Sequence, residues 1–198
     1  MAKGPSYRVP FRRRREGRTN YGLRRALLLS GRLRLVIRKS LNHIRLQVVE
    51  ARLGGDHVLV AATSEELRSR FGWSISCGNI PAAYLTGLLC GLKAKAKGIE
   101  GAVLDVGLHK PTRGSRIFAA LKGVLNSGVK VNCDENLLPG DEVIAGERIK
   151  NYAELLLTNS ELYKAKFSGY LLKGIPPEKI TEHFSEVKDR ILSSFNVK

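Results

Sequence analysis

The sequence predicts an α/β fold: a small α/β sandwich with a mixed sheet, a basic N-terminal arm and a helical C-terminal extension. Three observations support this prediction. Hydrophobic and polar residues alternate in three successive segments between residues 31 and 62, which is typical of an antiparallel meander of half-buried strands. A helical repeat over 80–92 precedes a short apolar strand, which predicts a crossover to a parallel strand. Basic residues are concentrated before residue 40 and define the arm.

The charge of the chain is unevenly distributed. The 198 residues include 34 Lys and Arg against 18 Asp and Glu, a formal net charge of +16. Thirteen of the basic residues and one acid, Glu16, fall within residues 1–40, so this segment carries +12 and the remaining 158 residues carry only +4. Because 43% of the residues are hydrophobic, the chain can bury a core. We therefore expect a folded body, with an arm that binds a polyanion.

The arm covers residues 1–30. Up to about residue 22 it alternates arginine with Gly, Pro and Tyr, so we expect it to stay mobile until a partner orders it. A short helix is expected from Tyr21 to Ser30, where leucines at 23, 27 and 28 share one side.

The α/β core covers residues 31–131, and its first strand follows Gly31. Hydrophobic residues at 33, 35 and 37 share one face of this strand, so the other face is basic. Two further strands over 44–48 and 58–62 complete the meander. The arginines expected on the outer face of the first strand are Arg32, Arg34 and Arg38.

The predicted crossover begins at Asn79, which is a good N-cap, and its helix ends near Gly98. A strand over 102–106 follows, and Ser115 is expected to cap a second helix that ends near residue 126. Residues 129–131 form a candidate edge strand. Residues 72–92 contain no charge, but their helical part would reach only about 20 Å, so we expect a core helix with a preceding loop.

Residues 132–198 are expected to form a loop followed by a helical extension. The loop covers 132–146, and helices are expected over 147–157 and 160–172. A last helix follows Pro177 and repeats hydrophobic residues at i, i+4, i+7 and i+11, which predicts one buried stripe. The residues of this stripe are Ile180, Phe184, Val187 and Ile191.

The three cysteines do not suggest a disulfide framework or a metal site. Cys77, Cys90 and Cys133 are 13 and 43 residues apart, and the four histidines have no zinc-ligand spacing with them. We expect reduced thiols in the core, no metal and no cofactor. No apolar segment follows the basic N-terminus, so we expect no secretory signal, no membrane partner and a cytoplasmic location.

The arm carries the strongest functional signal. Four consecutive arginines at 12–15 and Arg18 are flanked by Tyr7, Phe11 and Tyr21. Guanidinium groups bind phosphates in a bidentate manner and aromatic rings stack on unpaired bases, so this pattern favours RNA binding. A nuclear-localisation segment, a lipid-binding arm and a solvated tail remain as alternatives.

A second candidate site is the loop over 107–116, which precedes the predicted helix N-terminus. Lys110, Arg113 and Arg116 could form a phosphate cradle there, and an ordinary solvated loop is the alternative. The loop lacks the spacing of a nucleotide-hydrolysing P-loop.

We expect no catalytic residues. The one enzyme reading is a metal-dependent nuclease of ribonuclease-H-like fold, in which Asp105 would need metal-binding partners among Glu50, Asp56 and Asp134. A single strand aspartate is more often a structural hydrogen-bond acceptor.

Several segments, in order, resemble the family of the large-subunit ribosomal protein numbered eighteen. Residues 32–49 resemble its opening strand pair (RLRLVIRKSLNHIRLQVV), and its two helices resemble 79–87 (NIPAAYLTG) and 116–123 (RIFAALKG). The segment GERI at 146–149, followed by Tyr152 and Ala153, is similar to the archaeal branch. The region after about 132 also fits the archaeal and eukaryotic type, because the bacterial form ends soon after the second helix.

This resemblance implies a structural constituent of the large ribosomal subunit. Its partners would be 5S rRNA, the large-subunit rRNA of the central protuberance and neighbouring ribosomal proteins, including the other 5S-binding protein. A ribonuclease-H-like nuclease and a free RNA chaperone are the alternatives. The expected RNA-binding residues are Arg8, Arg12, Arg13, Arg14, Arg15, Arg18, Tyr21, Arg24, Arg25, Arg32, Arg34, Arg38, Lys39, Lys110, Arg113 and Arg116.

Overall fold

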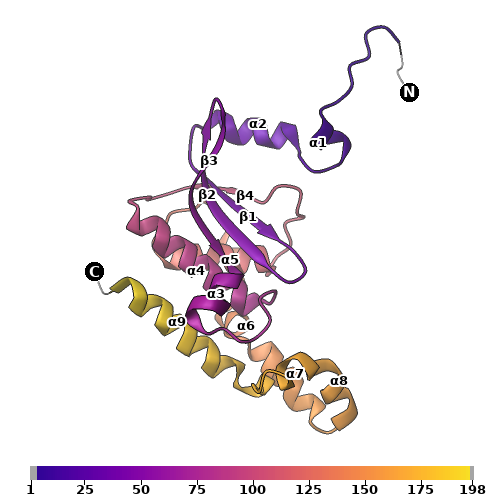
Figure 1. The fold of residues 1–198 in the computed structure, drawn as a ribbon, viewed down its shortest axis with the longest axis vertical. Helices are drawn as coiled ribbons and strands as arrows, with labels where there is room; N and C mark the ends of the chain where they lie inside the picture. Colours follow the sequence, from indigo (N-terminus) through magenta and orange to yellow (C-terminus); the bar gives the residue numbers. More distant parts are fainter. Residues whose placement is uncertain (1–3, 197–198) are drawn as a thin grey trace.

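A four-stranded mixed sheet lies at the centre of the computed structural model, which describes residues 4–196 (Figure 1). Its strands are β1 (Arg34–Lys39), β2 (Ile44–Arg52), β3 (Gly55–Thr63) and β4 (Val103–Asp105), in the order β3-β2-β1-β4. β1, β2 and β3 are antiparallel, and β4 is parallel to β1. The predicted meander, the parallel crossover strand and the α/β class are therefore confirmed.

The arm contains two helices, α1 (Arg12–Arg15) and α2 (Tyr21–Leu29). The second is the predicted one, and it begins where the Asn20 side chain accepts a hydrogen bond from the backbone N–H of Leu23. Figure 1 shows α2 beside the end of the β2–β3 hairpin, far from the C-terminal helices. Lys3, which contributes to the arm's charge, lies outside the described residues.

Two helices cover one face of the sheet. α4 (Ile80–Ala96) has Asn79 as its N-cap, as predicted, and α5 (Arg116–Asn126) follows Ser115. The helices pack closely because a Cβ on Gly87 would overlap the carbonyl oxygen of Ala120. Most of the hydrophobic face of the meander, including Leu35 and Ile37, is buried in the same core, whereas Val58 on β3 is 43% exposed.

Two predictions about the core differ from the structure. Helix α3 (Ser64–Phe71) was not expected, because only one hydrophobic residue, Leu67, is buried along it and no helical repeat marks it. Its signal is instead the capping box formed by Thr63 and Glu66. The prediction of an edge strand at 129–131 is wrong, since this segment forms only an isolated parallel β-bridge between Lys130 and Gly101.

The C-terminal part consists of α7 (Glu147–Leu156), α8 (Ser160–Leu171) and α9 (Ile180–Asn196), as predicted. The expected loop over 132–146 also holds two short elements, a 3₁₀ turn η1 (Glu135–Leu137) and α6 (Asp141–Ala145), and a second turn η2 (Pro177–Lys179) precedes α9. The predicted stripe of α9 is buried in the same core as the sheet and α4. Among the described helices, none has the length and apolar character to cross a bilayer.

The three cysteines are free, as predicted, and none is fully exposed. Burial raises the pKa of the Cys90 thiol to about 12, and burial also raises the pKa values of Cys77 and Cys133. All three are therefore thiols rather than thiolates near neutral pH when no ion is bound.

The close contact between α4 and α5 gives a first testable prediction. Gly87→Ala forces the two helices apart, because the added Cβ would also lie 2.8 Å from the Ala120 carbonyl carbon. We expect the free energy of unfolding in urea to fall by about 2 kcal/mol or more. The matched control is Gly169→Ala on α8, where an added Cβ meets no atom within 4 Å. The control should be neutral or slightly stabilising, so equal losses in both variants would contradict this account.

Candidate nucleic-acid interface

The arm presents a row of exposed arginines, as the sequence predicted. Three of its guanidinium groups have local partners: Arg12 and Arg18 contact Glu16 at 2.7 and 3.1 Å, and Arg13 donates to the Thr19 hydroxyl at 2.8 Å. These side chains remain open to solvent, with the Arg12 side chain 82% exposed. The exposed arm arginines without a side-chain partner in the described part of the chain are Arg8, Arg14, Arg15 and Arg25.

Aromatic rings accompany these arginines. Phe11 is 70% exposed, and its ring lies 5.2 Å from that of Tyr21 in a tilted arrangement. Tyr21 is half-buried at the start of α2. The pair provides a stacking surface directly beside the cluster at 12–15.

A polar cleft of about 510 Å³ separates the arm from the sheet. Arg13, Arg18 and Arg24 line its arm side, and Arg38 and Asp105 line the opposite wall. Because most of its charged groups are cations, this cleft is suited to a nucleic-acid phosphate or a base edge.

One predicted RNA-binding residue is placed differently. Arg34 is on the face expected from the strand alternation, but it is only 1% exposed, so the prediction that it contacts RNA is wrong. Its guanidinium lies 2.7 Å from the Asp56 carboxylate and 3.3 Å from the Asp105 carboxylate. The two carboxylates offset the cost of burying its charge, so Arg34 has a structural role.

Asp105 connects this buried charge to the 107–116 loop. Its carboxylate also accepts hydrogen bonds from Arg38 and from the backbone N–H of Gly107, both at 2.9 Å. Gly107 has a φ of +63°, and a Cβ there would lie 2.8 Å from the Arg38 guanidinium carbon. The glycine is therefore needed both for the turn and for the approach of Arg38, whose side chain is 41% exposed.

Asp56 connects the same buried charge to the arm. It lies 3.0 Å from Arg24 on α2 as well as 2.7 Å from Arg34. Burial pushes the pKa of Asp56 upward, but the guanidinium groups of Arg34 and Arg24 outweigh that effect and lower it below the ordinary value.

The 107–116 loop is cationic, but its basic residues differ in their contacts. Lys110 and Arg113 are exposed and have no carboxylate partner among the described residues. Arg116 is half-buried, and its Nη1 donates to the carbonyls of Ser40, Leu41 and Gly78 at 3.2, 3.3 and 2.7 Å. Lys110 and Arg113 therefore remain available to bind a phosphate, as predicted for the cradle. Arg116 mainly links the β1–β2 turn to the loop before α4.

His109 reports the electrostatic character of this loop. Its pKa is lowered, first by burial and then by the nearby cations Lys39, Arg38 and Arg116. Its Nε2 accepts a hydrogen bond from the Lys39 backbone N–H at 3.5 Å. The neutral imidazole thus lies in a positive field that would favour an anionic ligand.

The sequence-based list omits one residue that the geometry adds. Arg45 on β2 lies directly opposite Arg38 in the β1–β2 register and is exposed. Like charges in opposite positions repel, and of these two arginines only Arg38 pairs with Asp105. The sequence could have predicted this pairing, because Arg38 and Arg45 are equally far from the centre of the hairpin turn and therefore face each other across the strands.

Asp105 also bears on the nuclease alternative. Its carboxylate is engaged by two guanidinium groups and a backbone N–H, so it acts as a structural acceptor. Of its supposed metal-binding partners, Asp56 is likewise paired with arginines, and Glu50 pairs with Arg52 at 2.7 Å. This arrangement does not favour the nuclease reading.

Comparisons with known proteins agree with the character of this surface. A family of proteins described as "Ribosomal large subunit proteins 60S L5, and 50S L18" matches this chain over residues 5–100 and 92–134. A curated relative from Aeropyrum pernix, the "Large ribosomal subunit protein uL18", is 51% identical over 196 residues. That alignment covers 98% of this chain and 92% of the relative.

The buried ion pairs give a second prediction. Asp105→Asn removes one of the charges that compensate Arg34, so we expect the free energy of unfolding to fall by about 3 kcal/mol. The control is Asp141→Asn, because the Asp141 side chain is 89% exposed and its pair with Lys122 should contribute less than about 1 kcal/mol. Urea unfolding of both variants is the measurement. Similar decreases in the free energy of unfolding would show that the buried Arg34–Asp105 pair stabilises the fold no more than the exposed Lys122–Asp141 pair.

A third prediction concerns acid stability. Because the folded-state pKa of Asp56 is depressed, its contribution to stability is present above the unfolded value, near 3.8, and is lost as pH falls through the folded value. Asp56→Asn should therefore be less stable than the parent at neutral pH, and the difference should shrink below about pH 4. Unfolding free energies measured from pH 2 to 7 test this, and a difference independent of pH would contradict it.

Proposed function

Because this chain belongs to the family of large-subunit ribosomal proteins that includes 60S L5 and 50S L18, we propose that it binds 5S rRNA and attaches it to the large-subunit rRNA of the central protuberance. In this role it is a non-catalytic constituent of the cytoplasmic ribosome. Its further partners are neighbouring ribosomal proteins, including the other 5S-binding protein.

The observation that carries this proposal is the concentration of cations on the arm and the adjacent sheet face, where they outnumber the carboxylates that pair with them. The buried cation Arg34 has two carboxylates, whereas the arm and the adjacent sheet face leave many guanidinium groups open. Such groups repel one another unless an external polyanion neutralises them. The residues of this proposed RNA surface are Arg8, Arg12, Arg13, Arg14, Arg15, Arg18, Tyr21, Arg24, Arg25, Arg32, Arg38, Lys39, Arg45, Lys110 and Arg113.

The surface has two parts with different roles. The arm extends away from the sheet, so it can enter a space between packed RNA helices (Figure 1). Arg38 on the sheet is fixed by hydrogen bonds to the Asp105 carbonyl and carboxylate, so it helps to set the orientation of the RNA. Phe11 and Tyr21 add a place for an unpaired base.

Filter-binding titrations of 5S rRNA with the intact chain and with residues 1–19 deleted test the arm. The deletion keeps Asn20, which caps α2, and removes the six arm arginines from Arg8 to Arg18. If all six contact phosphates, the slope of log K against log salt should become less steep by about 5 units. Equal affinity and equal slope for the two chains would overturn the proposed role of the arm.

A matched pair of double variants separates position from net charge. Arg14→Gln with Arg15→Gln removes two exposed cations from the arm, whereas Lys164→Gln with Lys166→Gln removes two from α8. We expect the arm variant to reduce the salt slope by about 2 units and the α8 variant to change it little. Equal reductions would show that only the overall charge matters, and the proposed site would then be wrong.

A further inference from the structure

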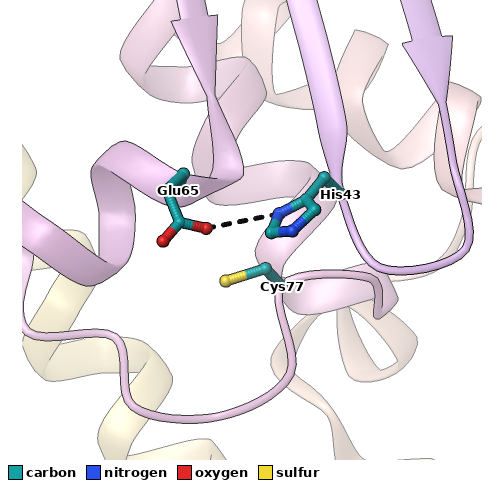
Figure 2. A group of neighbouring side chains, drawn as sticks. All are labelled: His43, Glu65 and Cys77. Atoms are coloured by element: carbon teal, nitrogen blue, oxygen red, sulfur yellow. Dashed lines mark ion pairs between the residues drawn. The ribbon is translucent and has the colours of Figure 1, made fainter.

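Three potential metal ligands meet beside the two backbone segments that Arg116 ties together. His43 is in the β1–β2 turn, Glu65 is in the first turn of α3, and Cys77 is in the loop before α4. Figure 2 shows the imidazole, the carboxylate and the sulfur around one shared space. Their ligand atoms all lie within 4.8 Å of one another. The three residues are distant in sequence, which is why ligand spacing gave no sign of them.

The separation of the nitrogen and oxygen ligands fits a tetrahedral ion. The His43 Nδ1 and Glu65 Oε2 atoms are 3.4 Å apart. Zinc bonds of about 2.0–2.2 Å to nitrogen and oxygen at a tetrahedral angle place two such ligands about 3.4 Å apart. The His43 and Glu65 side chains are 53% and 56% exposed, so an ion can enter from solvent. Cys77 closes the inner side of the space, at 7% exposure.

The backbone segments that carry the ligands are held together independently of any ion. The Cys77 loop packs directly on the β1–β2 turn, since a Cβ on Gly78 would lie 2.5 Å from the Leu41 carbonyl oxygen. Arg116 donates from one nitrogen to carbonyls of both segments. The positions of His43 and Cys77 are therefore largely set before binding, which lowers the entropic cost of forming a site.

Ser64 supports two of the ligands from behind. This fully buried residue accepts a hydrogen bond from the Ile44 backbone N–H at 3.1 Å, next to His43. Ser64 also directly precedes Glu65 at the start of α3, so it holds the backbone beside two of the three ligands. Groups behind the ligands that orient them in this way are a regular feature of metal sites.

From this arrangement we propose that His43, Glu65 and Cys77 form a binding site for Zn²⁺, with water in the fourth position. A ligand set of one nitrogen, one oxygen and one sulfur suits zinc better than the hard cations Mg²⁺ and Ca²⁺. On binding, the metal–sulfur bond replaces the S–H bond of Cys77, and the proton passes to solvent. The ion would join the β1–β2 turn, α3 and the loop before α4.

Cobalt substitution tests the site directly. The full chain, prepared without metal, is titrated with Co²⁺ and followed by absorption. We expect one equivalent to give the visible bands of tetrahedral cobalt together with a thiolate-to-cobalt charge-transfer band, and Zn²⁺ to displace it. Cys77→Ser should abolish the charge-transfer band, and His43→Asn or Glu65→Gln should weaken binding more than about tenfold.

Matched controls keep the outcome decisive. Cys133→Ser and His57→Asn remove a cysteine and a histidine outside the group, so both should bind cobalt like the parent chain. Circular dichroism confirms that each variant is folded before titration. Absence of a stoichiometric cobalt complex, persistence of the charge-transfer band in Cys77→Ser, or its loss in Cys133→Ser would each overturn the proposal.

Discussion

The buried guanidinium of Arg34 is the constraint on which the rest of this structure depends. A full charge at 1% exposure at the start of β1 is tolerated only because carboxylates from two other strands surround it. Asp56 comes from β3 and Asp105 from β4, so the interaction joins three strands across the sheet. The same two carboxylates contact Arg24 on α2 and Arg38 beside the 107–116 loop. The packing of the arm helix and the loop therefore follows from the compensation of one buried charge.

This constraint also explains how a chain with a large positive charge folds without a polyanion. Asp56 and Asp105 lie where burial makes the Arg34 cation costly, whereas the first 40 residues contain one acid, Glu16, among thirteen basic residues. Ion pairs at the surface contribute little, because solvent screens them. The arm arginines therefore gain little from internal partners such as Glu16, and their remaining attraction is available to phosphates. Fold stability consequently depends most on Arg34 and RNA affinity on the exposed arm arginines, so substitutions at Arg34 and at Arg14 or Arg15 can separate the two.

The sequence predicted well which residues share a face of one helix or strand, but it predicted poorly which residues of distant elements come into contact. The α9 stripe was predicted from periodicity alone, and all four of its residues are buried. The alternation in β1 correctly placed Arg34 on the face opposite the helices, but it could not show that Asp56 and Asp105 converge on that face. Helix α3 was missed because its signal is a capping box rather than a hydrophobic repeat. His43, Glu65 and Cys77 were missed for the same reason as Arg34, since only the fold brings them together.

Arg116 links the two proposed sites and shows why charge alone does not assign a role. It lies at the start of a helix in a cationic loop, a position that favours phosphate binding in sequence. Its Nη1 instead satisfies three carbonyls of two segments that carry His43 and Cys77. Zinc binding with loss of one proton would raise the local charge by one unit, so the proposed site would add to the positive field around Arg116 rather than reduce it. A metal in this position is therefore electrostatically compatible with an RNA partner at the neighbouring loop.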